Sequence, residues 1–295
     1  MFIQKFLQYI KYEKGYSTHT FVSYQTDLLQ FQDFAESKSI TFEPDKIDAS
    51  LVREWVVTLM ESGASARSVN RKLSTLKSFY RFLKQHNQAF HNPLKKIVAP
   101  KNKKQLPKFL KEDELENLLD GDDNFFENSF EGVRDKLMVD MFYTLGIRLS
   151  ELIGIKDTDI DMNGKTIMIT GKRNKQRLLP FGDKLKDAVQ EYMKVRNETV
   201  SRQCGNLFIK EDGGKLYPML VYRIINRNIT MVSSLSQRSP HVLRHTFATT
   251  MLNNGAELNA VKELLGHSNL AATEVYTHTT FEQLQKIYKQ AHPRA

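Results

Sequence analysis

The chain has 295 residues and a formal net charge of +9; 40% of its residues are hydrophobic and 26% are charged. These proportions are typical of a globular protein long enough for two domains. No stretch approaches the roughly 20 apolar residues of a membrane helix, and the single cysteine, Cys204, excludes an internal disulfide and a cysteine-rich zinc site. The N-terminus lacks the apolar region of a secretory signal, so we expect a cytoplasmic protein with no membrane partner.

The first part of the chain predicts a set of helices. Ser17 can cap one helix and Asp48 or Ser50 a second, because each precedes an apolar stripe at helical spacing. A third helix is predicted over 66–85. At ~100° per residue, its apolar residues share one side and its cations cluster on the other: Arg67, Arg71, Lys77, Arg81 and Lys84. Such a helix can pack on its own domain and lie along a DNA groove.

The third helix belongs to a long basic run. From Ser62 to Lys111 there are thirteen lysines and arginines and no aspartate or glutamate. This charge distribution suits a polyphosphate partner; a solvated basic face is the alternative. Prolines interrupt the run, and we expect an extended basic linker over 87–106 that adds candidate DNA contacts: Lys101, Lys103 and Lys104. The linker would separate a helical domain, 1–86, from a second domain, 107–295.

The second domain predicts a mainly α fold with a small β-sheet, an α+β arrangement. Two strand-like runs, 165–170 and 177–180, flank a turn and predict a hairpin. Helical patterns lie on both sides of it, at 112–119, 133–145, 185–196, 220–229, 242–253, 258–265 and 281–289.

Six residues of this domain are suited to phosphoryl transfer: Arg148, Lys172, His241, Arg244, His267 and Tyr276. Each alone is weak evidence, since a lone arginine is more often a surface residue and a lone tyrosine more often a buried one. Together they fit one reaction. Two arginines can hold the non-bridging oxygens of a phosphodiester, a histidine can move a proton near neutral pH, and cationic neighbours can activate a tyrosine as nucleophile. No carboxylate cluster suggests a Mg²⁺ site.

In their order and local context these residues resemble the tyrosine recombinases, and most of all the Xer branch. The resemblance rests on Arg148 in a Gly-x-Arg-x-Ser-Glu-Leu segment, the Gly-Lys turn of the hairpin, His-x-x-Arg-His, Leu-Gly-His and a tyrosine nine residues later. It spans nearly the whole chain. It implies a helical SAM-like core-binding domain followed by a catalytic domain, together forming a C-shaped DNA clamp.

The resemblance also implies roles for the residues. Tyr276 would attack the scissile phosphate and form a 3′-phosphotyrosyl link, while Arg148 and Arg244 would hold the phosphate and stabilise the transition state. The phosphotyrosine would conserve the energy of the bond, so that neither ATP nor a metal nor any other cofactor is expected.

Three further residues would move protons or orient the site. Lys172 would be the general acid for the leaving 5′-oxygen, His241 the general base or proton partner of the tyrosine, and His267 a phosphate ligand. Arg173 stands where many relatives have a second glycine, which makes this turn less permissive; Lys175 is the less favoured candidate for the acid.

The implied partner is double-stranded DNA at short specific sites, bound by a homo- or hetero-tetramer that exchanges strands through a four-way junction. A C-terminal helix near 281–288 would dock into a neighbouring subunit; packing on its own domain is the alternative. Xer proteins work with a paralogue and a septal DNA translocase to resolve chromosome or plasmid dimers, and the two-domain layout favours that role. The alternatives are an integrase or invertase of a mobile or phase-variable element, a type IB-like topoisomerase, and a DNA-binding protein without catalysis.

Overall fold

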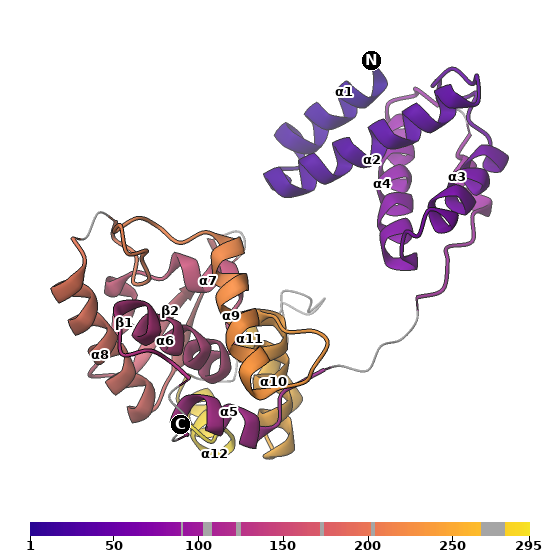
Figure 1. The fold of residues 1–295 in the computed structure, drawn as a ribbon. Helices are drawn as coiled ribbons and strands as arrows, with labels where there is room; N and C mark the ends of the chain where they lie inside the picture. The colour runs from indigo at the N-terminus through magenta and orange to yellow at the C-terminus, as the bar shows by residue number, and fades with distance from the viewer. Residues whose placement is uncertain (90, 103–107, 122–124, 172–173, 202–203, 267–280) are drawn as a thin grey trace. The chain divides into compact units, whose positions relative to one another are not determined.

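The computed structural model describes residues 1–89, 91–102, 108–121, 125–171, 174–201, 204–266 and 281–295 (Figure 1). The chain forms two compact units, Met1–Gln105 and Leu106–Ala295. Within the described ranges, no helix is both long and apolar enough to cross a membrane.

The N-terminal unit is helical. It contains α1 (Phe2–Gln8), a π-helical turn η1 (Tyr9–Glu13), α2 (Thr18–Ser37), α3 (Ala49–Glu61), α4 (Ala66–Gln85) and a 3₁₀ turn η2 (Pro93–Lys96). The hydroxyl of Ser17, the carboxylate of Asp48 and the hydroxyl of Ser65 accept hydrogen bonds from the first-turn N–H groups of α2, α3 and α4. The three helices expected from the sequence are therefore confirmed, and α1 is an addition. Apolar side chains of α1 to α4 meet in one core, which includes Phe6, Phe31, Trp55 and Phe79.

Part of the segment expected as a linker packs on this N-terminal unit. Leu94 and Ile97 are buried in its core, and the amide of Asn70 on α4 donates to the carbonyl oxygen of Pro100 at 2.8 Å. The chain up to Pro100 thus stays close to α4.

The C-terminal unit is built around one buried helix, α6 (Phe130–Leu145). Its helices are α5 (Glu112–Asp120), α6 (Phe130–Leu145), α7 (Leu149–Gly154), η3 (Asp157–Asp159, 3₁₀), α8 (Asp183–Thr199), α9 (Pro218–Val232), α10 (Pro240–Asn253), α11 (Leu258–Leu265) and α12 (Phe281–Ala291). Helix α6 lies in the middle of the unit (Figure 1) and is buried along most of its length. The mainly α fold with a small sheet is confirmed.

The sheet has three antiparallel strands in the order β1 (Ile160–Asp161), β2 (Thr166–Thr170) and β3 (Gln176–Pro180). Strands β2 and β3 form the expected hairpin, in which Thr170 pairs with Gln176 and Ile169 with Arg177. The Thr170–Gln176 pair is therefore the one next to the turn, and Arg177 belongs to the second pair from the turn.

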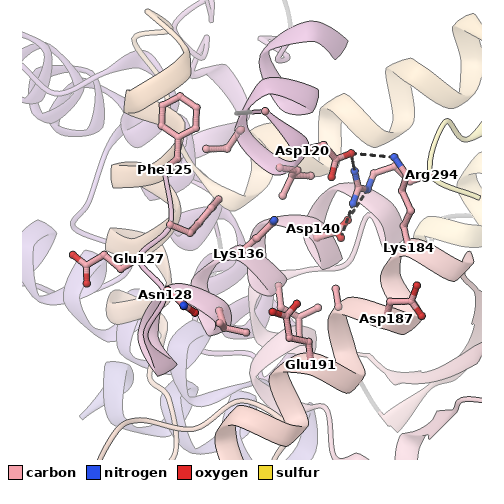
Figure 2. A pocket seen from close by; sticks show the side chains of 18 residues that line it. Asp120, Phe125, Glu127, Asn128, Lys136, Asp140, Lys184, Asp187, Glu191 and Arg294 are labelled. Carbon is pink, nitrogen blue, oxygen red and sulfur yellow. Dashed lines mark hydrogen bonds and ion pairs between the residues drawn. The ribbon is translucent and has the colours of Figure 1, made fainter. Parts of the chain in front are cut away.

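The C-terminal segment packs within its own unit. Leu284, Tyr288 and Ala291 of α12 are buried in the C-terminal core, which agrees with the alternative expectation for this helix. After it, the guanidinium of Arg294 donates to both oxygens of Asp140 at 3.0 Å and to Asp120 at 2.6 Å. Figure 2 shows this ion-pair cluster at the edge of a cavity of about 930 Å³.

Candidate active site

The backbone turn after α6 places the first arginine. Gly146 follows the last residue of α6 as its C-cap and adopts the left-handed conformation with φ 58°. Two residues later Arg148 stands in the extended N-cap position of α7, where its N–H donates to the carboxylate of Glu151 at 2.9 Å. The reversal of the chain and the cap together hold the backbone of Arg148 in one conformation.

The guanidinium groups of Arg148 and Arg244 converge on the end of α11. The Arg148 Nη2 group donates to the carbonyl oxygen of Gly266 at 3.0 Å, and Arg244 Nη2 donates to the preceding carbonyl, that of Leu265, at 2.8 Å. Arg244 also donates from Nη1 to the carbonyl oxygen of Gly146 at 2.6 Å. The structure therefore brings together two of the six predicted catalytic residues, which are 96 positions apart in the sequence.

A carboxylate and a third arginine complete this cluster, and sequence reasoning missed both. Buried Glu151 accepts a hydrogen bond from Arg148 Nη1 at 2.7 Å and two from Arg177 Nη1 and Nη2 at 3.1 and 2.8 Å. Burial favours a higher pKa for Glu151, but the hydrogen bonds and charges of Arg177 and Arg148 outweigh it and lower the pKa. The carboxylate is therefore ionised at neutral pH. Three cations against one carboxylate leave an excess of positive charge suited to a phosphodiester.

His241 lies one helical turn before Arg244 on α10. Partial desolvation lowers the pKa of the His241 ring, and the charges of Arg244, His245 and Arg148 lower it further. The imidazole is therefore neutral at pH 7 and able to accept a proton. Burial and the charge of Arg148 lower the pKa of Arg244 to about 10, which still leaves the guanidinium charged near neutral pH.

The remaining predicted catalytic residues, Lys172, His267 and Tyr276, lie outside the described residues. The described chain reaches Gly171 in the hairpin, where its N–H donates to the carbonyl oxygen of Lys175 at 2.7 Å and closes the turn. Among the residues that the structure describes, no cluster of three or more His, Cys, Asp or Glu side chains could hold a metal ion.

The cations predicted on α4 lie on the surface of the N-terminal unit. Arg67, Lys77, Arg81 and Lys84 are exposed. Three of them also border a groove of about 1050 Å³ between α4 and η2, together with two cations that the sequence analysis did not single out as contacts, Lys95 and Lys96. Lys101 is exposed, whereas Lys103 and Lys104 lie outside the described residues.

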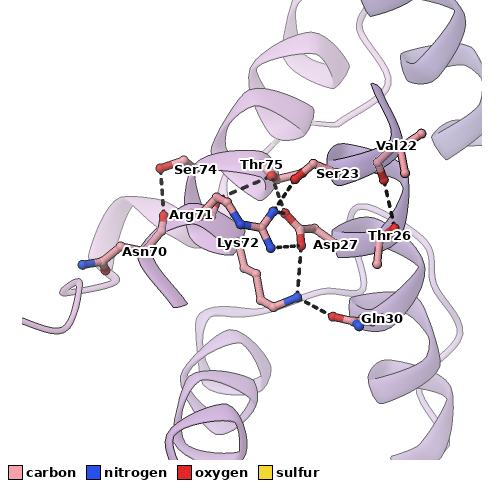
Figure 3. Close-up of polar contacts among 10 residues, drawn as sticks. All are labelled: Val22, Ser23, Thr26, Asp27, Gln30, Asn70, Arg71, Lys72, Ser74 and Thr75. Carbon is pink, nitrogen blue, oxygen red and sulfur yellow. Dashed lines mark hydrogen bonds and ion pairs between the residues drawn. The ribbon is translucent and has the colours of Figure 1, made fainter. Parts of the chain in front are cut away.

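Among the described residues, Arg71 differs from the other four predicted α4 cations because it is paired with an acid. Its Nη2 donates to the Asp27 carboxylate of α2 at 2.9 Å, and the same carboxylate accepts from Lys72 at 3.0 Å and from Thr75 at 2.9 Å (Figure 3). Asp27 is fully buried while about half of the Arg71 side chain is exposed. Arg71 therefore joins α4 to α2 and still presents an edge to solvent.

The comparisons with known proteins agree with this geometry. Residues 108–283 match the profile of the phage integrase family, and residues 3–87 match that of the phage integrase N-terminal SAM-like domain. The chain is 39% identical to tyrosine recombinase XerC of Halalkalibacterium halodurans, over 99% of this chain and 97% of that protein. It is 37% identical to tyrosine recombinase XerC of Chlorobaculum parvum, over 99% of this chain and 94% of the relative.

Solved structures share the fold. The XerH site-specific recombinase bound to palindromic difH substrate, in a post-cleavage complex, aligns with a TM-score of 0.73 at 23% identity, over 90% of this chain and 78% of that one. The Tn1549 transposon integrase in complex with transposon right end DNA aligns with a TM-score of 0.73 at 19% identity, over 98% of both chains.

The chain belongs to the phage integrase family of tyrosine recombinases. It is a site-specific DNA recombinase, and both of these curated relatives are XerC proteins.

Proposed function

We propose that this recombinase breaks and rejoins double-stranded DNA through a 3′-phosphotyrosyl link to Tyr276. The observation that carries the proposal is the convergence of Arg148 and Arg244 on the end of α11. The chain that follows this end contains His267 and Tyr276. Two forked donors at one point suit the two non-bridging oxygens of a phosphodiester.

The reaction follows from the charges of the site. Arg148 and Arg244 exchange their carbonyl contacts for the phosphate oxygens and stabilise the charge of the five-coordinate transition state. Neutral His241 accepts the phenolic proton as the Tyr276 oxygen bonds to phosphorus. Lys172 donates a proton to the 5′-oxygen as its bond to phosphorus breaks, and His267 orients the phosphate. Attack by a second 5′-hydroxyl reverses these steps and releases the tyrosine.

The N-terminal unit is proposed to hold the DNA backbone. Exposed cations on α4 and after it would neutralise phosphates, namely Arg67, Arg71, Lys77, Arg81, Lys84, Lys101, Lys103 and Lys104. The core-binding domain (1–86), linker (87–106) and catalytic domain (107–295) would then close around one DNA site as a clamp. Related folds have been solved with DNA bound, including XerH on difH substrate.

The proposed biological role is the resolution of chromosome or plasmid dimers in the cytoplasm at cell division. Sequence identity of 37% and 39% to XerC proteins, over 99% of this chain, supports this role. Four protomers, of one kind or with a paralogue, would act on two DNA sites, and a septal DNA translocase is a proposed partner. The Tn1549 integrase shares the fold at only 19% identity, so the sequence relatives favour the Xer role over integration of a mobile element.

A nicked suicide substrate tests the chemistry. Because the short strand beyond the cleavage point diffuses away, the covalent complex accumulates and is visible on a denaturing gel. Wild type is expected to form the adduct and Tyr276→Phe to form none, while Tyr12→Phe, which changes a 74% exposed tyrosine of the N-terminal unit, behaves as wild type. An adduct that survives in Tyr276→Phe would assign the nucleophile to another residue and refute the site.

A further inference from the structure

Two glycines that precede predicted catalytic residues face the same ion pair. A Cβ atom on Gly171, the residue before Lys172, would lie 3.2 Å from Glu151 Oε1. A Cβ atom on Gly266, the residue before His267, would lie 2.9 Å from Arg177 Nη1, and Gly266 also has a positive φ of 65°. A side chain at Gly171 would therefore fit tightly against Glu151, and one at Gly266 would require Arg177 to shift and would be strained by the positive φ.

Arg177 joins three separate segments of the C-terminal unit. From its place on β3 it donates Nη1 and Nη2 to Glu151 on α7, and Nε to the carbonyl oxygen of Leu264 on α11 at 2.8 Å. Its backbone pairs with Ile169 on β2. The hairpin is therefore attached to α7 and α11 at the end nearest its turn.

The pair is well shielded from water. The side chain of Arg177 is 15% exposed and that of Glu151 is 2% exposed. A guanidinium can hold a carboxylate through two donors and a carbonyl through a third, whereas a lysine offers one compact charge on a flexible stem. Lysine at position 177 would keep the charge and lose the geometry.

We propose that Arg177 is a positioning residue for strand cleavage: it fixes the hairpin against Glu151 so that Lys172, five positions earlier, reaches the leaving 5′-oxygen. The inference rests on the proposed function, because it assumes cleavage by Tyr276 with Lys172 as general acid. The alternative is that Arg177 stabilises the fold without affecting the geometry of the reaction.

The first experiment compares two arginines with similar surroundings. Arg196 on α8 also donates to a carboxylate, Asp157, through both Nη groups, and to a backbone carbonyl, that of Leu207. Among the described residues, its side chain pairs with Asp157, Asn197 and Leu207 and not with Arg148, Glu151 or Arg177. Single-turnover cleavage of the suicide substrate, at saturating protein and below the unfolding temperature of each variant, is measured for Arg177→Lys and Arg196→Lys. We expect Arg177→Lys to cleave about 100-fold more slowly, as for a reacting group misplaced by about 1 Å, and Arg196→Lys to cleave at the wild-type rate.

The second experiment replaces the bridging 5′-oxygen of the substrate by sulfur. A thiolate leaves without a protonating acid, so this substrate removes the need for Lys172. Lys172→Ala gives the reference: its cleavage rate should be far below that of wild type on the oxygen substrate and close to that of wild type on the sulfur substrate. Arg177→Lys is expected to recover most of its rate in the same way. A purely structural role for Arg177 would slow both substrates equally or neither.

Three outcomes overturn the inference. In the first, Arg177→Lys cleaves the oxygen substrate at the wild-type rate. In the second, its cleavage rate is reduced by the same factor on the sulfur substrate as on the oxygen substrate. Either result would show that Arg177 does not position the acid. Absence of any Tyr276-dependent adduct with wild type would refute the proposed function and this inference with it. If Arg177→Lys does not fold, the isosteric variant Glu151→Gln, which weakens the same attachment, takes its place. Its cleavage rate should likewise be reduced on the oxygen substrate and recover on the sulfur substrate.

Discussion

Arg148 and Arg244 hold backbone carbonyl oxygens where we expect phosphate oxygens to lie during cleavage. Carbonyls are weaker partners for a guanidinium than a phosphate is, because a phosphate carries a full negative charge and can accept two parallel N–H donors from one guanidinium. We therefore propose that the end of α11 is an exchangeable ligand that keeps both arginines oriented without DNA. Glu151 limits their mutual repulsion by pairing with Arg148.

His241 gives a prediction about pH. Partial desolvation and neighbouring cations lower its pKa from the ordinary value of a histidine, so the imidazole is neutral at pH 7 and becomes protonated only at lower pH. If the neutral form is the base, single-turnover cleavage is flat near pH 7 and falls as the pH drops through that lowered pKa. His241→Gln is expected to reduce the plateau rate by about 10²–10⁴-fold and to abolish this fall.

The measurement is the rate of adduct formation on the suicide substrate between pH 5 and pH 8. His19→Gln, which changes an exposed histidine of the N-terminal unit, serves as the control and should show the same fall in rate at low pH as wild type. A wild-type rate that rises toward low pH, or an unchanged profile in His241→Gln, would contradict the assignment.

At the level of single residues, local sequence context predicted some roles and left others hidden. Arg148 and Arg244 stand in recognisable segments, and the structure brings them together. Glu151 and Arg177 are 26 residues apart, and Asp27 and Arg71 are 44 apart. No spacing rule connects such pairs, because their contact depends on how hairpin, turn and helices pack. For the same reason helical angle alone placed Arg71 on a free cationic face, although it is bound to Asp27.

Helix α4 gives a prediction at the scale of one element. Among the described residues, none forms an ion pair with Lys77, Arg81 or Lys84, whose charges are therefore available to DNA phosphates. Their simultaneous replacement by glutamine should reduce the slope of log Kobs against log salt concentration by about 0.9 for each phosphate that the variant no longer neutralises, and by at most about 2.7. Fluorescence anisotropy with a duplex at several salt concentrations measures it.

The control removes the same number of charges elsewhere on the N-terminal unit. It replaces three exposed lysines of which two are paired with glutamates, by Lys5→Gln, Lys38→Gln and Lys46→Gln. An equal change of slope in both triple variants would mean that only net charge matters and that DNA does not bind along α4.

The C-terminal segment gives a second prediction at this scale. Arg294 pairs with buried Asp140, so Arg294→Met leaves a carboxylate unpaired in the core. We expect a loss of about 3 kcal/mol in the free energy of unfolding and a fall in Tm of roughly 6–12 °C. Lys184→Met removes the other partner of Asp120 but changes a 62% exposed side chain, and should cost less than about 1 kcal/mol. Equal losses in both variants by urea unfolding would contradict this account.

Most elements could be predicted because their limits are encoded locally. Ser17, Asp48 and Ser65 cap their helices through their own side chains. Strand β1 has only two residues and exists because β2 offers an edge to pair with, so it has no pattern of its own. The segment after α12 is held on its own unit by His292 and Arg294, which contact Tyr143 and Asp140 of α6. The amphipathic pattern of the helix does not reveal these contacts.

At the scale of the whole molecule, each unit has its own hydrophobic core. The N-terminal core draws its buried residues from Ile3 to Ile97 and the C-terminal core from Leu110 to Ala291. Since the two cores share no residue in the described part of the chain, a fragment of residues 106–295 should fold and unfold cooperatively without the first unit.

The fragment separates chemistry from DNA affinity. It retains all six predicted catalytic residues, so at saturating protein it should form the Tyr276-dependent adduct. It lacks the cations of α4 and of the segment up to Lys104, so duplex affinity should fall by about 100-fold, equivalent to about 2.8 kcal/mol. Anisotropy titrations of the full chain and the fragment measure the loss, with the fragment carrying Tyr276→Phe as the control for cleavage. A folded fragment that binds as tightly as the full chain would place the DNA contacts in the catalytic unit. A folded fragment that forms no adduct at saturation would mean that the N-terminal unit takes part in assembling the active site.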